Sequence, residues 1–445
     1  MRHTTRILAI IHLAYPIIIG QIGNIMQGWA DTIMVGQYGT PELSAAGFVN
    51  NVFNLVVYFL MGISYATSPV VARHYGQKQH MEVLRTFYNS NALNLLAALF
   101  IVAVMGTLYV NMDVLGQPVQ LMPLIRPYYL ILLASMPFLA LFNSMKQFSD
   151  AMGDTKTPMW IMLGANVANL VLNYLLIFTF DLGLVGAGLA TLASRMLMPL
   201  AMYVAVRRYV LKHRLADVVA DGVEAPRCTR KGMLLLARLG LPISAQLCLE
   251  TGSFNVCAIF MGWIGADALA MHQIACTVGT VCFMTYYGVG AAAAIRMAHY
   301  RGMGDWTEVR KTAHVSFALS MSIGIVATCL VLNLSPFIAS AFTTSESVKA
   351  LFYSILPCFA CYQFGDCLQT IYANALRAIE SVKAMMGYAF LAYCIVSIPL
   401  AYVFAFPCGM GAVGVWWSFP FGLTVAGVCY FLQFRKSVKV KSMGA

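Results

Sequence analysis

Two acidic residues lie deep inside long apolar segments in the second half of the chain. Glu250 lies about halfway along one segment, and Asp366 lies in another, four residues after Tyr362. Because residues four apart share one face of a helix, Tyr362 and Asp366 can present a hydroxyl and a carboxylate to the same ion. Oxygen ligands of this kind suit a hard cation. Without a cation, desolvation and mutual repulsion favour protonation of one carboxylate, so these residues can hold Na⁺ or H⁺; the alternative is a structural pair.

A second polar cluster is expected in the first half of the chain. Asp31 lies in the outer part of the first apolar segment, and Asn169 and Asn173 lie four apart in the fifth. Buried amides need hydrogen-bond partners, so these side chains can gather around the Asp31 carboxylate. Two alternatives stay open. Asp31, five residues before Gly36, can lie close to the membrane interface, and the amides can make ordinary hydrogen bonds between helices.

Four further residues are candidates for lining a cavity: Phe254, His272, Gln273 and Arg195. Arg195 lies in the middle of an apolar segment and either faces a cavity or extends its charge to the membrane surface. His272 has no metal-ligand companion at helical spacing, so it and Gln273 have either a cavity-lining or a structural role. The many Met, Phe and Tyr side chains suit organic cations, although most of them must face lipid or the protein core. No cofactor is expected.

These side chains must be held by helices that cross a membrane. The 445 residues are 60% hydrophobic and only 10% charged, with a mean hydropathy of +0.75, so they cannot cover a water-facing surface with polar groups. Lipid offers no partners for backbone N–H and C=O groups, which requires each apolar run to be a helix. An all-α polytopic membrane protein is therefore predicted. Twelve runs are long enough to cross a hydrocarbon core of about 30 Å: residues 7–35, 43–72, 84–110, 121–146, 157–180, 183–207, 234–262, 266–298, 308–332, 347–375, 383–405 and 411–434.

The formal net charge of +11 is explained by the placement of the basic residues. Lys and Arg gather in every second loop from Arg2 to Lys441, whereas the intervening loops carry almost none, with Arg126 and Lys349 as exceptions. The positive-inside rule then places both termini in the cytoplasm, so the basic excess reflects topology and no nucleic-acid partner is expected. The first apolar run continues to Val35 with no evident cleavage site, which indicates a membrane span rather than a signal peptide. We expect a monomeric, multi-pass protein of the cell inner membrane.

The chain contains an internal repeat. An offset of 226 aligns Pro16 with Pro242, and an offset of 228 aligns the Gly-x-x-Gly sequence at Gly183 with that at Gly411. Six helices per half is an even number, so both copies enter the membrane in the same orientation, related by a pseudo-twofold axis. The predicted organisation is an N-terminal six-helix lobe, a cytoplasmic linker and a C-terminal six-helix lobe: residues 1–206, 207–231 and 232–445.

Several motifs together resemble the multidrug and toxic compound extrusion (MATE) family, on its NorM-like branch. The resemblance covers nearly the whole chain, and no single motif carries it alone. The motifs are Leu13-Ala-Tyr-Pro16 with Asp31-Thr-Ile-Met-Val-Gly36, Leu241-Pro242-Ile with Glu250 and Phe254, Met271-His272-Gln273-Ile274 with Phe283-Met284, and Tyr362-x-x-x-Asp366-x-x-Gln369.

This resemblance implies two lobes about a central cavity and export of organic cations or drugs by antiport with Na⁺ or H⁺ through alternating access. It implies a second-lobe cation site, with the Na⁺ ligands of a sodium-coupled member, at Glu250, Tyr362 and Asp366. It implies a first-lobe cluster at Asp31, Asn169 and Asn173.

The sequence departs from the family pattern at two places. The usual Arg-Gly-x-Gly-Asp-Thr-like turn is Arg377-Ala-Ile-Glu380-Ser381-Val382 in the second half, whereas the first half keeps Gly153-Asp154-Thr155. Asn173 stands where other branches carry an acid, which weakens the case for proton coupling in the first lobe.

Three other classes of protein fit this sequence less well. A major-facilitator transporter would carry a Gly-x-x-x-Asp-Arg-x-Gly-Arg-Arg-like loop, where this chain has Ala72-Arg-His-Tyr-Gly76-Gln-Lys. A lipid or cell-wall-precursor flippase of the same superfamily is the alternative function, but it favours a more cationic cavity than Arg195 alone provides. An enzyme is not expected, because no hydrolase or diphosphate motif occurs; Asp150-Ala-Met-Gly-Asp154 is the nearest approach and lies in a predicted cytoplasmic turn.

Overall fold

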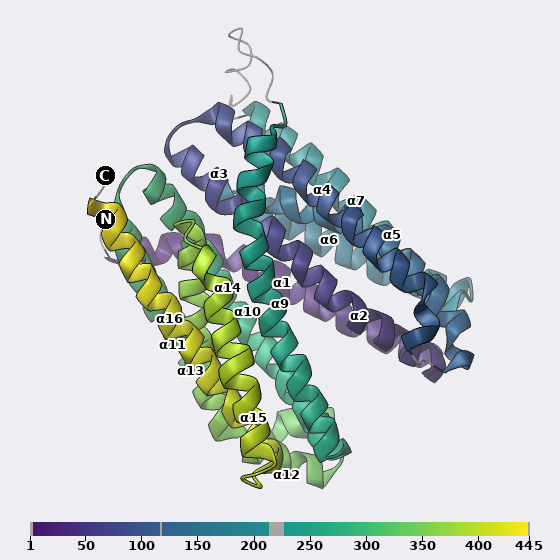
Figure 1. Cartoon of the computed structure of the whole chain (residues 1–445). Helices are drawn as coiled ribbons and strands as arrows, with labels where there is room; N and C mark the ends of the chain where they lie inside the picture. Colours follow the sequence, from purple (N-terminus) through teal and green to yellow (C-terminus); the bar gives the residue numbers. More distant parts are fainter. Residues whose placement is uncertain (1–2, 116–117, 213–226, 444–445) are drawn as a thin grey trace. The chain divides into compact units, whose positions relative to one another are not determined.

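The computed structural model describes residues 3–115, 118–212 and 227–443, and all regular structure in these ranges is helical (Figure 1). The first half consists of α1 (His3–Tyr38), α2 (Thr40–Tyr65), α3 (Thr67–Gly76), α4 (His80–Val110), two short 3₁₀ turns (Met112–Leu115 and Val119–Leu121), α5 (Met122–Ala151), α6 (Lys156–Asn173), the π-helical segment η3 (Tyr174–Thr179) and α7 (Gly183–Lys212). The second half consists of α9 (Arg230–Ile264), α10 (Ala266–Gly302), α11 (Trp306–Phe342), α12 (Glu346–Ser354), α13 (Leu356–Ala378), α14 (Lys383–Ala389), the π-helical segment η4 (Phe390–Ser397), α15 (Ile398–Ala405) and α16 (Gly411–Met443).

Eleven of the helical segments that the structure describes are long and apolar enough to cross a membrane, and they correspond to eleven of the twelve predicted spans. Several extend beyond the predicted ends, as where the run 308–332 continues to Phe342, because a helix can continue past the hydrocarbon core. The remaining predicted span, 347–375, consists of two helices, α12 and α13, that meet at Ile355. With 23 residues, α13 is about 35 Å long. It is more polar than the eleven other predicted spans, and most of its side chains are buried against protein. An all-α polytopic membrane protein is confirmed.

One pair of glycines shared by the two halves, Gly186 and Gly414, is explained by close helix contacts. A Cβ atom on Gly186 would lie 2.7 Å from the backbone carbonyl carbon of Leu176, and one on Gly414 would lie 2.6 Å from that of Phe404. Both members of the second contact align with those of the first at the offset found in the sequence, since 414 − 186 = 228 and 404 − 176 = 228. The repeat therefore preserves a backbone contact that only glycine permits.

The chain divides into two compact units. The C-terminal unit comprises Met1–Ile18 and Ala245–Ala445, and the N-terminal unit comprises Ile19–Ser244. Both boundaries lie at equivalent points of the repeat, since 244 − 18 = 226. The first helix of each half, α1 or α9, thus contributes its beginning to one unit and its remainder to the other.

This division differs from the predicted lobes, 1–206 and 232–445. The sequence assigned all of α1 to the first lobe and all of α9 after residue 231 to the second, because chain order was the only guide to domain membership. The cytoplasmic placement of the linker 207–231 stays a prediction, and its residues 213–226 lie outside the described part of the chain.

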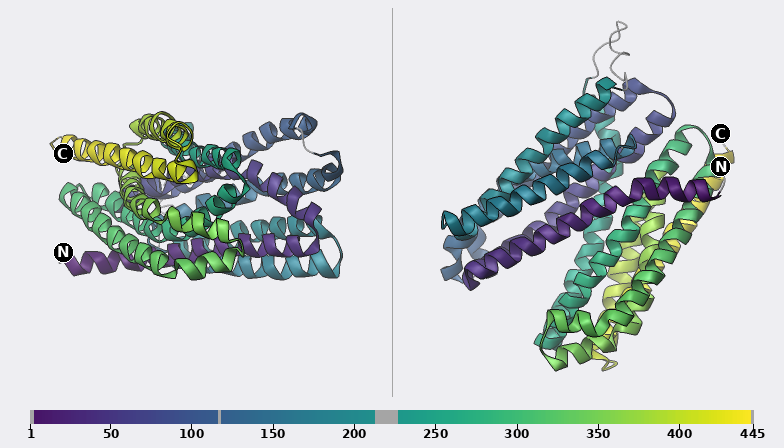
Figure 2. Two further views of the ribbon diagram at one scale, coloured as in Figure 1. Left: turned by 90° about the horizontal axis from the view of Figure 1, so that it is seen from below. Right: turned by 180° about the vertical axis from the view of Figure 1, so that it is seen from behind.

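The beginning of α1 is packed within the C-terminal unit. Ile10 and Ala14 are buried in one apolar cluster with Val289 of α10 and Val315 of α11. Figure 2 shows this first part of α1 running alongside the green helices. This burial of apolar surface stabilises the start of α1 within the C-terminal unit independently of any polar contact.

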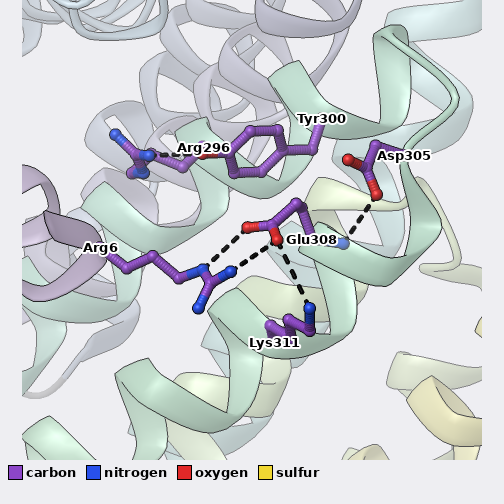
Figure 3. A network of polar contacts seen from close by, with 6 residues as sticks. All are labelled: Arg6, Arg296, Tyr300, Asp305, Glu308 and Lys311. Atoms are coloured by element: carbon purple, nitrogen blue, oxygen red, sulfur yellow. Dashed lines mark hydrogen bonds and ion pairs between the residues drawn. The ribbon is translucent and has the colours of Figure 1, made fainter. Parts of the chain in front are cut away.

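A bidentate ion pair fixes the same segment of α1. The guanidinium Nε and NH2 of Arg6 donate to the two carboxylate oxygens of Glu308 at 2.8 and 2.7 Å (Figure 3). Asp305 caps the start of α11 by accepting a hydrogen bond from the Glu308 backbone N–H at 2.9 Å. Lys311 Nζ lies 3.8 Å from Glu308. Arg6 therefore occupies both oxygens of a carboxylate that is held in place by the helix start.

We expect Arg6→Gln to loosen the start of α1, because one neutral amide cannot replace the bidentate pair with Glu308. Hydrogen exchange of the backbone amides of residues 5–15 should become about tenfold faster or more, as in a helix end that opens locally. Lys311→Gln is the matched control and should leave this exchange unchanged. Equal exchange rates in the Arg6 and Lys311 variants would contradict the assigned role of the pair.

The turn that follows α13 has the same hydrogen bonds as the turn that follows α5. In each, a backbone N–H donates to the carbonyl five residues earlier, at 3.1 Å for Asp154 and 2.9 Å for Ser381. The preceding residue is left-handed in both turns, with φ of 86° at Gly153 and 52° at Glu380. Arg301 contacts the Glu380 carboxylate at 3.0 and 3.2 Å. The departure from the family pattern thus preserves the turn, with an ion pair offsetting the strain of a non-glycine residue.

Two substitutions at Glu380 separate backbone strain from the ion pair. Glu380→Ala and Glu380→Gly both remove the contact with Arg301, but only Gly adopts a positive φ freely. The Gly variant is expected to be about 1 kcal/mol more stable than the Ala variant in SDS unfolding titrations. Gly153→Ala should cost a similar amount. Equal stability of the two Glu380 variants would show that the positive φ carries no strain.

Candidate functional site

Glu250 in α9 lies at the centre of a polar chain within the C-terminal unit. Its Oε2 accepts hydrogen bonds from the amide of Gln246, one helical turn earlier, at 2.7 Å and from the amide of Gln369 in α13 at 3.0 Å. Gln246 Oε1 accepts from the guanidinium of Arg377 at 2.7 Å, and the charge of Arg377 also acts on Glu250. Gln246, Gln369 and Arg377 are buried, so Glu250 is oriented by fixed donors.

Asp366 in α13 is 2% exposed and is surrounded by hydroxyl groups. Tyr286 of α10 donates to its Oδ2 at 2.5 Å, and Thr370 donates to its Oδ1 at 3.4 Å. Tyr362, one turn before Asp366, is also buried and lies within electrostatic range of this carboxylate. As their spacing in the sequence predicted, Tyr362 and Asp366 lie on the same face of α13.

The structure brings the three predicted cation ligands, Glu250, Tyr362 and Asp366, into one polar cluster. Gln369, three residues after Asp366, bonds to Glu250 and also donates to the Tyr393 hydroxyl at 3.0 Å. Glu250 and Asp366 repel each other electrostatically. Their proximity comes from the packing of α9 on α13, while their role in binding an ion stays a prediction.

The donor atoms of this cluster are mainly oxygens. Two carboxylates and the hydroxyls of Tyr286, Tyr362 and Thr370 form a set that fits Na⁺ or a proton. Among the described residues, no group of three His, Cys, Asp or Glu side chains is arranged to hold a metal ion.

An aromatic cluster covers one side of these polar residues. Phe254 of α9 stacks on Phe419 of α16 with ring centroids 4.5 Å apart, and Tyr362 contacts them at 6.5 and 6.4 Å. His272 is 2% exposed and packs on Phe419 and Trp416 at 6.4 and 5.8 Å. His272 and Phe254, predicted as cavity candidates, thus lie in a packed aromatic wall that limits the access of water to Tyr362.

The other two cavity candidates differ in their surroundings. Gln273 is exposed on α10. Arg195 of α7 is partly buried, and its guanidinium donates to the Ser135 hydroxyl of α5 at 2.8 Å. Its charge also interacts with Asp31 and with the Tyr128 hydroxyl. The partners that the sequence did not identify for Arg195 therefore lie within the N-terminal unit.

The predicted first-half cluster is present in the N-terminal unit. Asn173 Nδ2 donates to Asp31 Oδ1 at 2.5 Å and to Asn169 Oδ1 at 3.1 Å, and Asn169 Nδ2 lies 3.5 Å from the Ser194 hydroxyl. Both asparagines are fully buried. Asn173 Oδ1 has no hydrogen-bond partner among the described residues. A buried acceptor beside a carboxylate fits a site that takes up a proton or a cation.

Six members of the second-half cluster were not predicted from the sequence: Gln246, Gln369, Thr370, Tyr286, Tyr393 and Arg377. The first three lie three or four residues from a predicted carboxylate, so helical spacing could have found them. The two tyrosines lie on other helices, and only tertiary structure brings them in. Arg377 was counted among the basic residues that indicate cytoplasmic loops, whereas its side chain is buried, with only 6% of its surface exposed.

Comparison with known families identifies both halves of the chain. The MatE family model matches residues 16–175 and 242–403. The starts of the two matches differ by the offset found by aligning the sequence with itself, since 242 − 16 = 226. The internal repeat is therefore a repeat of the family's own unit.

Curated relatives and solved structures match over nearly the whole length. The "Probable multidrug resistance protein NorM" of Bradyrhizobium diazoefficiens is 31% identical, covering 96% of this chain and 92% of the relative. The "Multidrug resistance protein NorM" of Vibrio cholerae is 27% identical, covering 95% of each. A crystal structure of MATE in the bent conformation has a TM-score of 0.88 at 20% identity, covering 98% of this chain and 96% of that one. The outward-facing conformation of a multidrug resistance MATE family transporter has a TM-score of 0.87 at 21% identity, with 97% and 96% covered. In both sequence and fold, this chain belongs to the MatE family, the multidrug and toxic compound extrusion family that its motifs resemble.

Proposed function

We propose that this protein exports organic cations and drugs from the cell by antiport with Na⁺ or H⁺ through alternating access. The observation that carries the proposal is a pair of carboxylates within the helices: Glu250, held by two side-chain amides, and the buried Asp366, surrounded by hydroxyl groups. Ionisable side chains within a membrane are costly, about 2.5–3.5 kcal/mol each on the insertion scale, and mark ion or substrate pathways. Relatives whose names describe multidrug resistance proteins support the substrate class.

The proposed coupling follows from the need to neutralise these carboxylates. A Na⁺ held by oxygens of Glu250, Tyr362 and Asp366, or a proton on either carboxylate, reduces the repulsion between the two acids. An organic cation competes for the same negative charge, directly or through the conformation that the neutralised site favours. Binding of one cation therefore promotes release of the other.

The membrane potential can drive such an exchange. One positive charge that moves inward down the potential gains about 2.3 kcal/mol per 100 mV, which supports a concentration gradient of more than tenfold. The aromatic wall of Phe254, His272 and Phe419 helps to keep the site dry, where charge interactions are strong.

Efflux from reconstituted vesicles tests the function and identifies the ion. Purified protein is placed in liposomes loaded with ethidium or norfloxacin, and Na⁺ and pH gradients are imposed separately. Efflux that depends on one gradient supports antiport and names the coupling ion. Efflux that is equal without any gradient would exclude antiport, and absence of efflux for all drugs tested under both gradients would overturn the substrate class.

The proposal includes a topology. The alternation of basic loops supports an orientation with both termini in the cytoplasm. The bacterial NorM relatives support a location in the inner membrane of the cell. Fusions of a periplasm-active or a cytoplasm-active reporter to the end of α16 test this orientation. Activity of the periplasmic reporter there would reverse it. A monomer is proposed as well, and the mass of the detergent-solubilised protein tests it.

A further inference from the structure

A basic cavity lies in the C-terminal unit, where the end of α16 meets the beginning of α11. Its volume is about 770 Å³. Figure 2 shows the C-terminus of α16 and the turn between α10 and α11 at the same end of this unit. None of the lining residues is acidic. The basic lining residues are Arg310, His314, Arg435, Lys436 and Lys439.

Among the described residues, no acidic side chain pairs with the positive charge of this cavity, because its Arg and Lys side chains form no ion pair with an acid. Glu308 lies two residues before Arg310, but both of its oxygens accept from Arg6 (Figure 3). His314 lies within electrostatic range of Arg310 and Arg435. Like charges gathered around one cavity repel, so a bound anion would stabilise this arrangement.

The floor of the cavity is aromatic and well packed. Phe434 is 1% exposed, and its ring lies 5.8 Å from that of Tyr372 in α13. Phe431 contacts the same tyrosine at 4.9 Å, and the Arg435 guanidinium lies 5.6 Å above the Phe431 ring. The Tyr372 hydroxyl is 3.4 Å from His314 Nδ1. A basic rim above a fixed apolar floor suits a ligand that has both an anionic and an apolar part.

Exposed apolar side chains precede the basic residues of α16. Val428 and Leu432 are 42 and 55% exposed. In a membrane helix such side chains face lipid tails, whereas the basic residues at its end lie at the level of the head groups. Acyl chains could therefore lie along α16 while a head group occupies the cavity.

We propose that this cavity binds the phosphate-bearing head group of an anionic phospholipid. The phosphate is held by Arg310, Arg435, Lys436 and Lys439, with the acyl chains against the exposed apolar face of α16. Basic pockets between membrane helices on the cytoplasmic side are suited to such head groups. Cations at the end of a helix also favour its dipole and its topology, but those roles require neither a shared cavity nor an aromatic floor.

Lipid binding to the purified full-length protein tests this proposal. Phosphatidylglycerol and phosphatidylcholine are titrated separately, and bound lipid is counted by native mass spectrometry. The cavity variant combines Arg310→Gln, Arg435→Gln and Lys439→Gln. Each positive charge that contacts the head group contributes about fivefold to anionic-lipid affinity, so we expect this variant, which removes three such charges, to bind phosphatidylglycerol at least about tenfold more weakly.

A matched control carries the same change at another basic helix end. Arg207, Arg208 and Lys212 are exposed at the end of α7 in the N-terminal unit. Their replacement by Gln should change the affinity for phosphatidylglycerol by less than about twofold if the cavity is specific. Equal losses in the two variants would show that general surface charge attracts the lipid, and would overturn the proposal.

Two further results distinguish a lipid from a soluble anion. Phosphatidylcholine, which has no net charge, is expected to bind weakly to the same site, and equal binding of both lipids would overturn the assignment. Inorganic phosphate in excess is expected to displace little phosphatidylglycerol, and complete displacement would identify a soluble-anion site instead. Thermal melting confirms that the variants are folded; if the triple variant is not, Arg435→Gln with Lys439→Gln provides the same comparison. Binding is measured without transport, so its outcome is independent of the proposed function.

Discussion

Glu250→Gln and Asp366→Asn are each expected to reduce ion-driven efflux by about tenfold or more, because either change removes one of the two carboxylates within the membrane helices that a coupling cation would neutralise. The substitutions keep the size and hydrogen-bonding capacity of the side chains, and the amide that replaces the Glu250 carboxylate could still accept from Gln246 and Gln369. The measurement is ethidium efflux from everted vesicles or liposomes under the gradient that drives the wild-type protein.

Asp267→Asn is the matched control for these two variants. Asp267 is an exposed carboxylate at the start of α10, where it accepts a hydrogen bond from Ser347 at 2.6 Å. Its neutralisation should leave efflux unchanged, since it lies outside the buried cluster. Wild-type efflux in both the Glu250 and Asp366 variants would remove the basis for the proposed ion site, whereas a loss in all three would point to a general effect on folding.

Asp31→Asn is expected to destabilise the protein by about 2–3 kcal/mol, more than Arg195→Gln. The reason is that Arg195 and Asp31 respond differently when the opposite charge is removed. Arg195 is partly buried in the N-terminal unit and cannot release its proton, so loss of Asp31 leaves its charge uncompensated. Asp31 can instead take up a proton when Arg195 is lost, and that variant should cost less than about 1 kcal/mol. SDS unfolding titrations of both single variants and the double variant measure the difference.

An exposed pair provides the comparison for this prediction. Arg126 and Asp113 lie 3.1 Å apart with side chains 43 and 73% exposed, so neutralising either one should cost less than about 1 kcal/mol. A double variant of Asp31 and Arg195 that is no more stable than predicted by adding the single effects would contradict the coupling. Equal costs for Asp31→Asn and Arg195→Gln would contradict the asymmetry.

The helices could be predicted because lipid allows few alternatives. Each apolar run must satisfy its own backbone hydrogen bonds, so length and hydropathy were enough to locate them. The run 347–375 shows the limit of this reasoning. It passes as one span by length, but α12 and α13 meet at Ile355, and the polar composition of α13 reflects its burial among other helices.

The candidate ion site was predicted in part. The high cost of a charge in a membrane identified Glu250 and Asp366, and helical spacing added Tyr362. Tyr286 and Tyr393 belong to the same cluster but lie 80 and 24 residues from their partners Asp366 and Gln369. No local pattern connects residues at such separations.

By itself, the sequence determined the membrane helices, their duplication in the two halves and the carboxylates that make a site plausible, because each follows from local composition or from comparing the chain with itself. Tertiary structure alone decided that the start of α1 belongs to the C-terminal unit, where Arg6 donates hydrogen bonds to both carboxylate oxygens of Glu308. It also decided which donors hold Glu250 and that basic residues from α11 and α16 surround one cavity. The physical reason is that hydropathy fixes which segments enter the membrane, whereas side-chain packing and hydrogen-bond geometry fix which of their faces meet.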